Sequence, residues 1–151
     1  MIRFAVLLFL AVPLILVTPS PAQAQRETAV TVPLEVFVQR VARLWANAEA
    51  GGIATLAPAD GRILLEIGGE TSAVQARHAA AAFRALFADR QSISVRPARV
   101  TIAGDSPPQG FGEISWTFRS RGVSNPQTQT LYIGAVWEGR GWRITELRLI
   151  P

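Results

Sequence analysis

Apolar residues recur every three or four positions from Pro33 onward, which is the period of a helix with one buried face. Proline suits the first turn of a helix, because its missing N–H has no partner there, and glycine favours the end of a helix. These signals predict a helix that begins at Pro33 and ends at Gly51-Gly52. Its expected core positions are Leu34, Phe37, Val38, Val41, Leu44, Trp45 and Ala48.

A second helix is expected later in the chain. Between the two helices, the pattern predicts a short helical turn over 53–59 and one strand over 62–67, which the glycine pair after it ends. The second helix is expected from residue 71 or 72 to Asp89. Its packing side is rich in alanine and would approach its neighbour closely: Ala76, Ala79, Ala80, Phe83, Leu86 and Phe87.

The chain beyond the second helix alternates apolar and polar residues, as half-buried strands do. Ile93 and Val95 share one phase of this alternation, whereas Val100 and Ile102 share the other. A change of phase at Pro97 therefore predicts a bulge or a bend within one long strand.

Three further strands are expected over 113–119, 127–137 and 142–150, joined by loops of hairpin length. Helices followed by a run of strands predict an α+β fold. We expect an N-terminal helix and a second helix packed on a strongly curved antiparallel sheet of four to five strands.

The first segment has the layout of a secretory signal peptide over residues 1–24. Arg3 precedes a run of fourteen uncharged residues, and 22–24 reads Ala-Gln-Ala, the small-x-small pattern of a signal-peptidase site. A membrane span needs about 20 apolar residues, so the run is short for the alternative, an uncleaved anchor. We expect a flexible lead-in over 25–32 and one exported domain over 33–151, periplasmic or secreted, without a stable membrane anchor after cleavage.

Composition narrows the chemistry that this domain could perform. The 151 residues include no cysteine, which removes disulfides, thiolate metal ligands and a cysteine nucleophile together. All fifteen basic residues are arginine, and eleven acidic residues alternate with them for a net charge of +4. A nucleic-acid-binding protein would gather its positive charge on one face. The mixed signs therefore predict a solvated surface and no nucleic-acid partner.

Short stretches of the second helix and of the last hairpin carry a family resemblance. They are Gln75-Ala76 with 83–87 (Phe-Arg-Ala-Leu-Phe), and 131–134 (Leu-Tyr-Ile-Gly) with 141–144 (Gly-Trp-Arg-Ile). Together with the order of elements and the bent strand, they resemble the nuclear transport factor 2-like superfamily, also called cystatin-like or ketosteroid-isomerase-like, and within it small exported domains of unknown function.

The resemblance covers about residues 33–150 and implies a cone, in which a curved sheet wraps around the long N-terminal helix. The chain departs from many members in its single short strand before the second helix. Members include isomerases, dehydratases, hydrolases and non-catalytic binding or dimerising modules, so the shape leaves the function open.

An isomerase of this kind would need a carboxylate base inside the cone, opposite a tyrosine or a protonated acid. The candidates are Glu113, Glu146 and Tyr132, the only tyrosine. If the three faced the hollow together, they would form a general-base site with a phenolic donor. The alternative, which we favour, is that both glutamates lie on the solvent face and pair with arginines on neighbouring strands.

Other polar residues have structural explanations. Asp60, Asp89 and Asp105 fall at expected turns or helix ends, where aspartate caps and turns form. His78, the only histidine, lies away from the Phe83 side of its helix and is expected at the surface. A single histidine without cysteine predicts no transition-metal site, and no phosphate-binding loop or nucleophile elbow occurs. We expect no metal and no cofactor.

Core packing can explain all four tryptophans. In the alternative, Trp137 and Trp142 line the mouth of the cone or an exposed sheet face, together with Tyr132 and Val136. Apolar side chains on both faces of strand 127–137 support such a second contact. The contact would be with a small apolar ligand, a protein partner or a second copy of the chain.

Three functions remain open. We favour an exported non-catalytic binding or interaction module that uses the concave or the outer face of the curved sheet. The alternatives are a small lyase or isomerase with its base in the cone, and a structural homodimer. An enzyme requires the two glutamates to face the hollow, and an interior ligand requires a cavity of roughly 300 Å³ or more.

Overall fold

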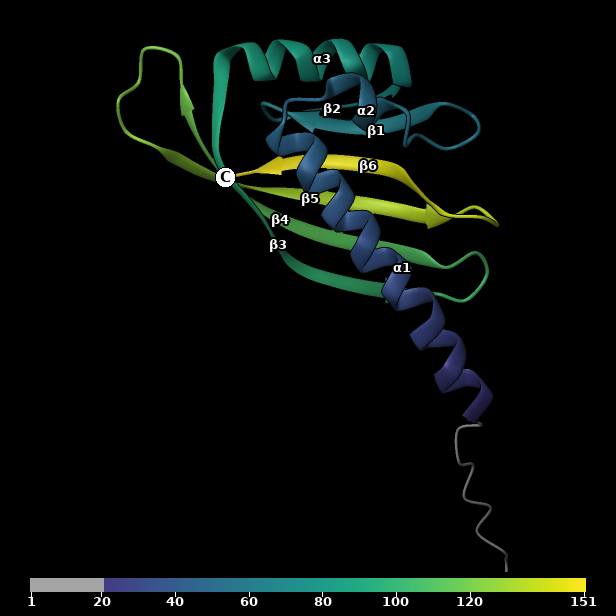
Figure 1. Cartoon of the computed structure of the whole chain (residues 1–151). Helices are drawn as coiled ribbons and strands as arrows, with labels where there is room; N and C mark the ends of the chain where they lie inside the picture. Colours follow the sequence, from purple (N-terminus) through teal and green to yellow (C-terminus); the bar gives the residue numbers. More distant parts are fainter. Residues whose placement is uncertain (1–20) are drawn as a thin grey trace, which may run out of the picture.

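The computed structural model describes residues 21–151, with side chains from Pro33 onward. Of the expected signal peptide, residues 1–20 lie outside this part of the chain. The described residues form three helices and six strands, which Figure 1 labels. In chain order these are α1 (Pro21–Ala46), α2 (Ala50–Ala54), β1 (Arg62–Ile67), β2 (Glu70–Gln75), α3 (Ala76–Asp89), β3 (Arg90–Ala103), β4 (Gln109–Ser120), β5 (Gln127–Trp137) and β6 (Trp142–Ile150).

Helix α1 differs at both ends from the helix that the sequence predicts. It begins at Pro21, so residues 25–32 are helical and Pro33 lies inside the helix. The helix continues through Thr-Val-Pro at 31–33, although β-branched residues and proline have low helix propensity. The helix ends at Ala46, two residues before Ala48 takes a left-handed φ of 56°. The expected stop at the glycine pair is wrong, because both glycines belong to α2.

The sheet has six strands in the order β2-β1-β6-β5-β4-β3. Neighbouring strands are antiparallel except β1 and β6, which are parallel, so the sheet is mixed. The α+β class is confirmed, whereas the sheet has one or two strands more than the expected four to five, and the expected antiparallel sheet is wrong at β1 and β6. Figure 1 shows α1 crossing one face of the sheet, with α3 running along its β1–β2 side.

Strand β2 is the element that the sequence pattern missed. The first residues of the expected second helix, from 71 to Gln75, belong to this strand, and the helix begins at Ala76. Most β2 side chains are exposed, so burial leaves no alternating pattern to read. The usable signal was Gly68-Gly69, since both residues have positive φ and join β1 to β2 as a tight hairpin. The expected departure from the family, a single strand here, is therefore wrong.

Strand β3 is long and irregular, as its phase change predicts. Its pairing with β4 shifts register between Ser92 and Ser94 and again between Pro97 and Arg99. The second shift confirms the irregularity expected at the proline. Bulges increase the local twist of a strand, so these two positions help the sheet to curve over α1.

Aromatic side chains fill the space between the helices and the sheet. Trp45 of α1 is fully buried and meets Phe83, Phe87 and Trp116 edge to face, with ring centroids 5.7, 5.0 and 5.4 Å away. Trp116 also packs on Phe118 at 4.3 Å. The expected placement of Trp45 and Trp116 in the core is confirmed. The hollow of the sheet therefore holds side chains at this end.

Two glycines of β4 let α1 lie directly on the sheet at its other end. A Cβ atom at Gly110 would come within 2.7 Å of Leu34 Cδ1, and one at Gly112 within 2.8 Å of Val38 Cγ2. Real Cβ atoms do not approach other atoms so closely, so only glycine fits under the helix at these positions. Helix and sheet are in contact along the hollow.

Candidate functional site

The structure brings Glu113, Tyr132 and Glu146 together, on the face of the sheet that points away from α1. We call this the outer face; its central members are Phe111, Glu113, Tyr132, Glu146 and Arg148. Glu113 of β4 lies opposite Tyr132 of β5, which lies opposite Arg148 of β6. The residues on either side of Glu113 and Tyr132 along their strands are all buried towards α1. These are Gly112, Ile114, Leu131 and Ile133.

A β-bulge decides that Glu146 joins this group. The register between β5 and β6 shifts between Gly134 and Ala135, which pair with Glu146 and Ile144. Ile144 and Leu147 are both buried, so the extra residue Thr145 changes the phase of β6 between them. Without the bulge, Glu146 would share the inward phase of Ile144.

Tyr132 is the centre of the outer face. Its ring stacks on Phe111 with centroids 6.0 Å apart, and the guanidinium of Arg148 lies 5.5 Å from the ring centroid. Partial burial raises the pKa of the Tyr132 phenol, and the charges of Glu146 and Glu113 raise this pKa further, against the opposing effect of Arg148. The phenol is therefore a neutral hydrogen-bond donor at physiological pH.

The acidic residues of the outer face pair with arginines, as the favoured alternative expects. Arg148 Nε donates a hydrogen bond to Glu146 Oε1, and it lies 3.8 Å from Glu66 Oε2 on β1. The hydrogen bond and the charge of Glu146 raise the pKa of Arg148. Arg99 Nη1 of β3 lies 3.9 Å from Glu113 Oε1. These solvent-accessible pairs link β3 to β4 and β1 to β6 by charge, and surface pairs of this kind add little to stability.

This geometry favours binding chemistry over proton transfer. A catalytic carboxylate works in a pocket that excludes water and holds the reacting carbon beside it. Glu113 and Glu146 instead lie on an open face, on the far side of the sheet from the hollow, and each faces an arginine. The arrangement lacks the feature that the isomerase hypothesis requires, a base inside the cone.

The four residues proposed as a ligand or partner surface do not form one site. Tyr132 and Val136 are half-buried on the outer face. Trp137 and Trp142 pair across the β5–β6 hairpin on the side of α1, with ring centroids 5.5 Å apart. Trp142 is only 4% exposed and its indole N–H has no acceptor, whereas Trp137 is half-buried.

The tryptophan pair lines a surface pocket of about 340 Å³, which we call the hairpin pocket. Helix α1 forms one wall, and the β5–β6 hairpin forms the other. Three arginines that the sequence analysis did not single out surround it, because their proximity depends on how the hairpin folds against α1. The lining residues are Pro33, Val36, Phe37, Arg40, Leu56, Trp137, Arg140, Gly141, Trp142 and Arg143.

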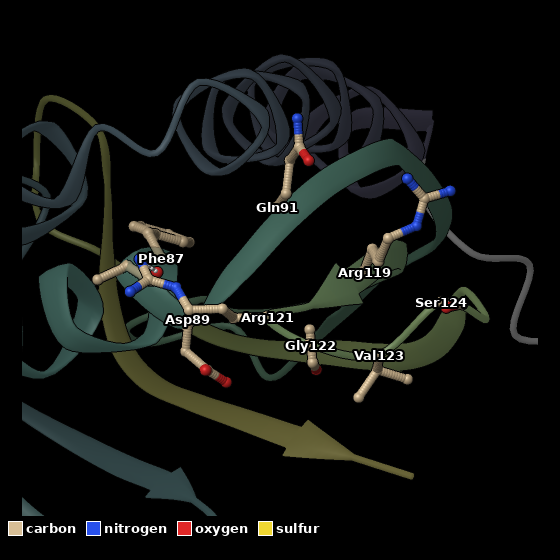
Figure 2. Close-up of a pocket in the computed structure, with 10 residues that line it drawn as sticks. Phe87, Asp89, Gln91, Arg119, Arg121, Gly122, Val123 and Ser124 are labelled. Carbon is tan, nitrogen blue, oxygen red and sulfur yellow. Dashed lines mark hydrogen bonds between the residues drawn. The ribbon is translucent and has the colours of Figure 1, made fainter.

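A larger open pocket of about 670 Å³ lies where α3 ends and where the chain turns from β4 into β5 (Figure 2). Arg121 reaches back across it and donates to the Ala88 carbonyl oxygen at 2.9 Å, while its backbone N–H donates to the Asp89 carbonyl oxygen at 2.8 Å. Figure 2 shows Arg119 pointing away from Arg121. Arg121 therefore caps the C-terminus of α3.

The remaining polar candidates lie where the sequence placed them. Asp60 Oδ1 accepts the backbone N–H of Arg62 at 3.0 Å, Asp89 is the last residue of α3, and Asp105 lies in the β3–β4 loop. His78 is exposed on α3. Among the side chains from Pro33 onward, no three histidine, aspartate or glutamate residues gather in a way that could hold a metal ion. No helix over residues 21–151 is long and apolar enough to cross a membrane.

Comparison with known proteins identifies the fold. No protein-family model matches the chain, and no curated protein matches it. Solved structures do match. An NTF2-like protein with a cystatin-like fold from Novosphingobium aromaticivorans is 15% identical with a TM-score of 0.58, over 85% of this chain and 86% of that one.

Two further matches extend this result. A DUF4783 family protein from Bacteroides ovatus is 12% identical with a TM-score of 0.58, over 73% of this chain and 90% of its own. A protein with a ketosteroid isomerase-like fold from Catenulispora acidiphila, solved with trimethylamine, is 18% identical with a TM-score of 0.60, over 76% and 83%. The chain has the nuclear transport factor 2-like, cystatin-like fold, as the resemblance predicts.

Proposed function

We propose that this chain is an exported, non-catalytic interaction module and that the outer face of its sheet is the contact surface. The observation that carries the proposal is the seating of α1 on Gly110 and Gly112, together with the Trp45 cluster. Helix and aromatic rings occupy the hollow in which relatives of this shape could hold a ligand. The outer face, with Tyr132 half-buried at its centre, is the broad surface left for a partner.

A second copy of the chain is the partner that the charges support best. The outer face carries both signs, with Glu66, Glu113 and Glu146 beside Arg99 and Arg148. A two-fold axis could place the acidic residues of one copy on the arginines of the other, whereas a face of one sign would repel itself. Strands about 4.8 Å apart with about 3.3 Å per residue give β3–β6 a face of roughly 700 Å², close to what each partner of a stable complex buries.

If the chain dimerises through the outer face, a single substitution on that face should separate the two copies. The wild-type chain is expected to sediment as a dimer at micromolar concentration, and Tyr132→Glu is expected to weaken the dimer at least about tenfold. The new carboxylate would lie near Glu113, Glu146 and Arg148, and a charged group in place of the half-buried ring opposes burial against a second copy. Sedimentation equilibrium measures both states.

The matched control is Arg84→Glu, which introduces the same side chain on the exposed face of α3 and should leave the dimer intact. Circular dichroism checks that both variants are folded. A wild-type chain that sediments as a monomer, or a Tyr132→Glu variant that stays dimeric, would overturn the proposal.

Export is the other part of the proposal, and the cleavage motif supports it. Cleavage after Ala24 would leave every α1 residue that the structure describes as buried, from Leu34 onward. The full-length chain produced in a bacterium is expected in the periplasm or medium, with Gln25 as its first residue in N-terminal sequencing. Ala24→Leu, which removes the small residue before the cut, should retain the precursor, while Ala29→Leu should be processed normally. Cytoplasmic wild-type protein that starts at Met1 would contradict export.

A further inference from the structure

We propose that the hairpin pocket binds a small amphipathic carboxylate, with its apolar body against Trp137 and its anionic group beside Arg40 and Arg140. This proposal concerns the α1 side of the molecule and does not depend on the outer-face dimer. It rests on the shape of the pocket, its apolar floor and the charge around it.

The floor of the pocket is apolar and largely rigid. Phe37, Leu56 and Trp142 are each less than 10% exposed and belong to the main core, so their positions are fixed by packing. Trp137 is half-buried above them, and Val36 beside it is 57% exposed, the most exposed large apolar side chain over residues 33–151. An apolar ligand body would cover these two side chains without displacing the core.

The charge around the pocket is positive. Arg40 comes from the exposed side of α1, while Arg140 and Arg143 come from the β5–β6 hairpin. Glu138 pairs with Arg143 at 3.9 Å, and it also accepts the Ala59 backbone N–H at 3.3 Å.

Among the side chains from residue 33 onward, Arg40 and Arg140 have no acidic group within 4.0 Å. Two guanidinium groups are therefore left to pair with an anion, and the planar guanidinium matches a carboxylate well.

Size and shape favour a small molecule over a membrane surface. The volume of about 340 Å³ lies at the low end of small-molecule pockets. A membrane-binding surface would project its apolar side chains outward, whereas three of the apolar residues here form the floor of a concavity. Arg40 lines that concavity from α1, and Arg140 lines it from the β5–β6 hairpin.

The experiment is isothermal titration calorimetry with sodium octanoate. Octan-1-ol, which has an alkyl chain of the same length and no charge, is the control ligand. Octanoate is expected to bind the wild-type chain at least about tenfold more tightly than octan-1-ol. The double variant Arg40→Gln/Arg140→Gln should lose at least that factor for octanoate and bind the alcohol unchanged. Trp137→Ala should weaken both ligands, and Arg84→Gln on α3 should weaken neither.

Several outcomes would overturn the proposal. Equal binding of acid and alcohol would show an apolar groove without anion recognition. Octanoate binding that survives Trp137→Ala and the double variant would place the ligand elsewhere. Cosedimentation with phosphatidylglycerol vesicles, which the double variant abolishes, without binding of monomeric octanoate would identify the pocket as a membrane contact. Thermal melts of each variant separate loss of binding from loss of folding.

Discussion

Trp45→Ala is expected to lower the free energy of unfolding by about 3–5 kcal/mol, the usual effect of removing a buried tryptophan or phenylalanine. Trp45 is fully buried and contacts aromatic rings from α3 and from β4, so it joins α1 to α3 and to the sheet. The edge-to-face contacts add to the loss beyond the buried area. Small domains are stable by about 5–15 kcal/mol, so this one change removes a large part of the total.

Urea unfolding followed by circular dichroism measures this loss. Trp137→Ala is the control, because it removes the same side chain from a half-exposed position and should cost much less. Trp45→Phe should also cost less than the alanine change, since it keeps a ring and removes an indole N–H that has no acceptor. Equal losses for the two alanine variants would contradict the account of the core.

Gly112→Val is expected to destabilise the chain by about 1–3 kcal/mol, although valine has the higher β-propensity. The Cβ atom would lie 2.8 Å from Val38 Cγ2, and the stiff valine side chain on α1 cannot move away without shifting the helix. Overpacking should therefore outweigh the gain that a strand makes when glycine is replaced.

The control for this change is a glycine with open space around it. Gly51 in α2 has no atom within 4 Å of a built Cβ and has an ordinary φ, so Gly51→Ala should stabilise the chain by about 0.5–1 kcal/mol. Urea unfolding of both variants should thus give changes of opposite sign. A stabilising Gly112→Val would show that α1 does not rest on β4.

The sequence predicts the long-range plan of this fold because its core elements are strongly periodic. Leu34 to Trp45 form one helical stripe, and β4 alternates cleanly from Gly112 to Phe118, so most inward residues of both elements were predicted correctly. Ala48, expected in the core, is wrong, because it lies exposed beyond the end of α1, and the buried Ala42 was not predicted. Strand β2 was missed because its side chains are exposed and therefore follow no burial pattern. Local turn chemistry at Gly68-Gly69 was the better guide there.

The candidate sites depend on geometry that periodicity does not contain. Alternation along β4 is enough to place Glu113 on the other face of the sheet from buried Ile114. Only the register between β4 and β5 places Tyr132 opposite Glu113. The face of Glu146 depends on a bulge beside Gly134. Apolar residues 142 and 144 share one phase and 147 and 149 the other, so the sequence does mark this bulge, but the expected strand over 142–150 was treated as regular. Arg40 belonged to a polar helix face, and its role in the hairpin pocket arises when two distant segments meet.

Gly110 and Gly112 did carry a signal that the sequence analysis left unused. A glycine within a strand marks a place where another part of the chain approaches the backbone closely. Both precede the strand expected over 113–119, although both lie within β4 under α1. Read in this way, they would have indicated that the hollow of the sheet is filled rather than open.

The filled hollow is the central claim, and a double-mutant cycle on Gly112→Ala and Val38→Ala tests it most directly. Each single change should destabilise the chain, the first by overpacking and the second by leaving a cavity. In the double variant the added methyl group occupies the space that Val38 vacates. The account predicts that the double variant loses less stability than the sum of the singles, by about 1 kcal/mol or more. Additive losses would contradict it, because they would mean that α1 and β4 do not touch at this point.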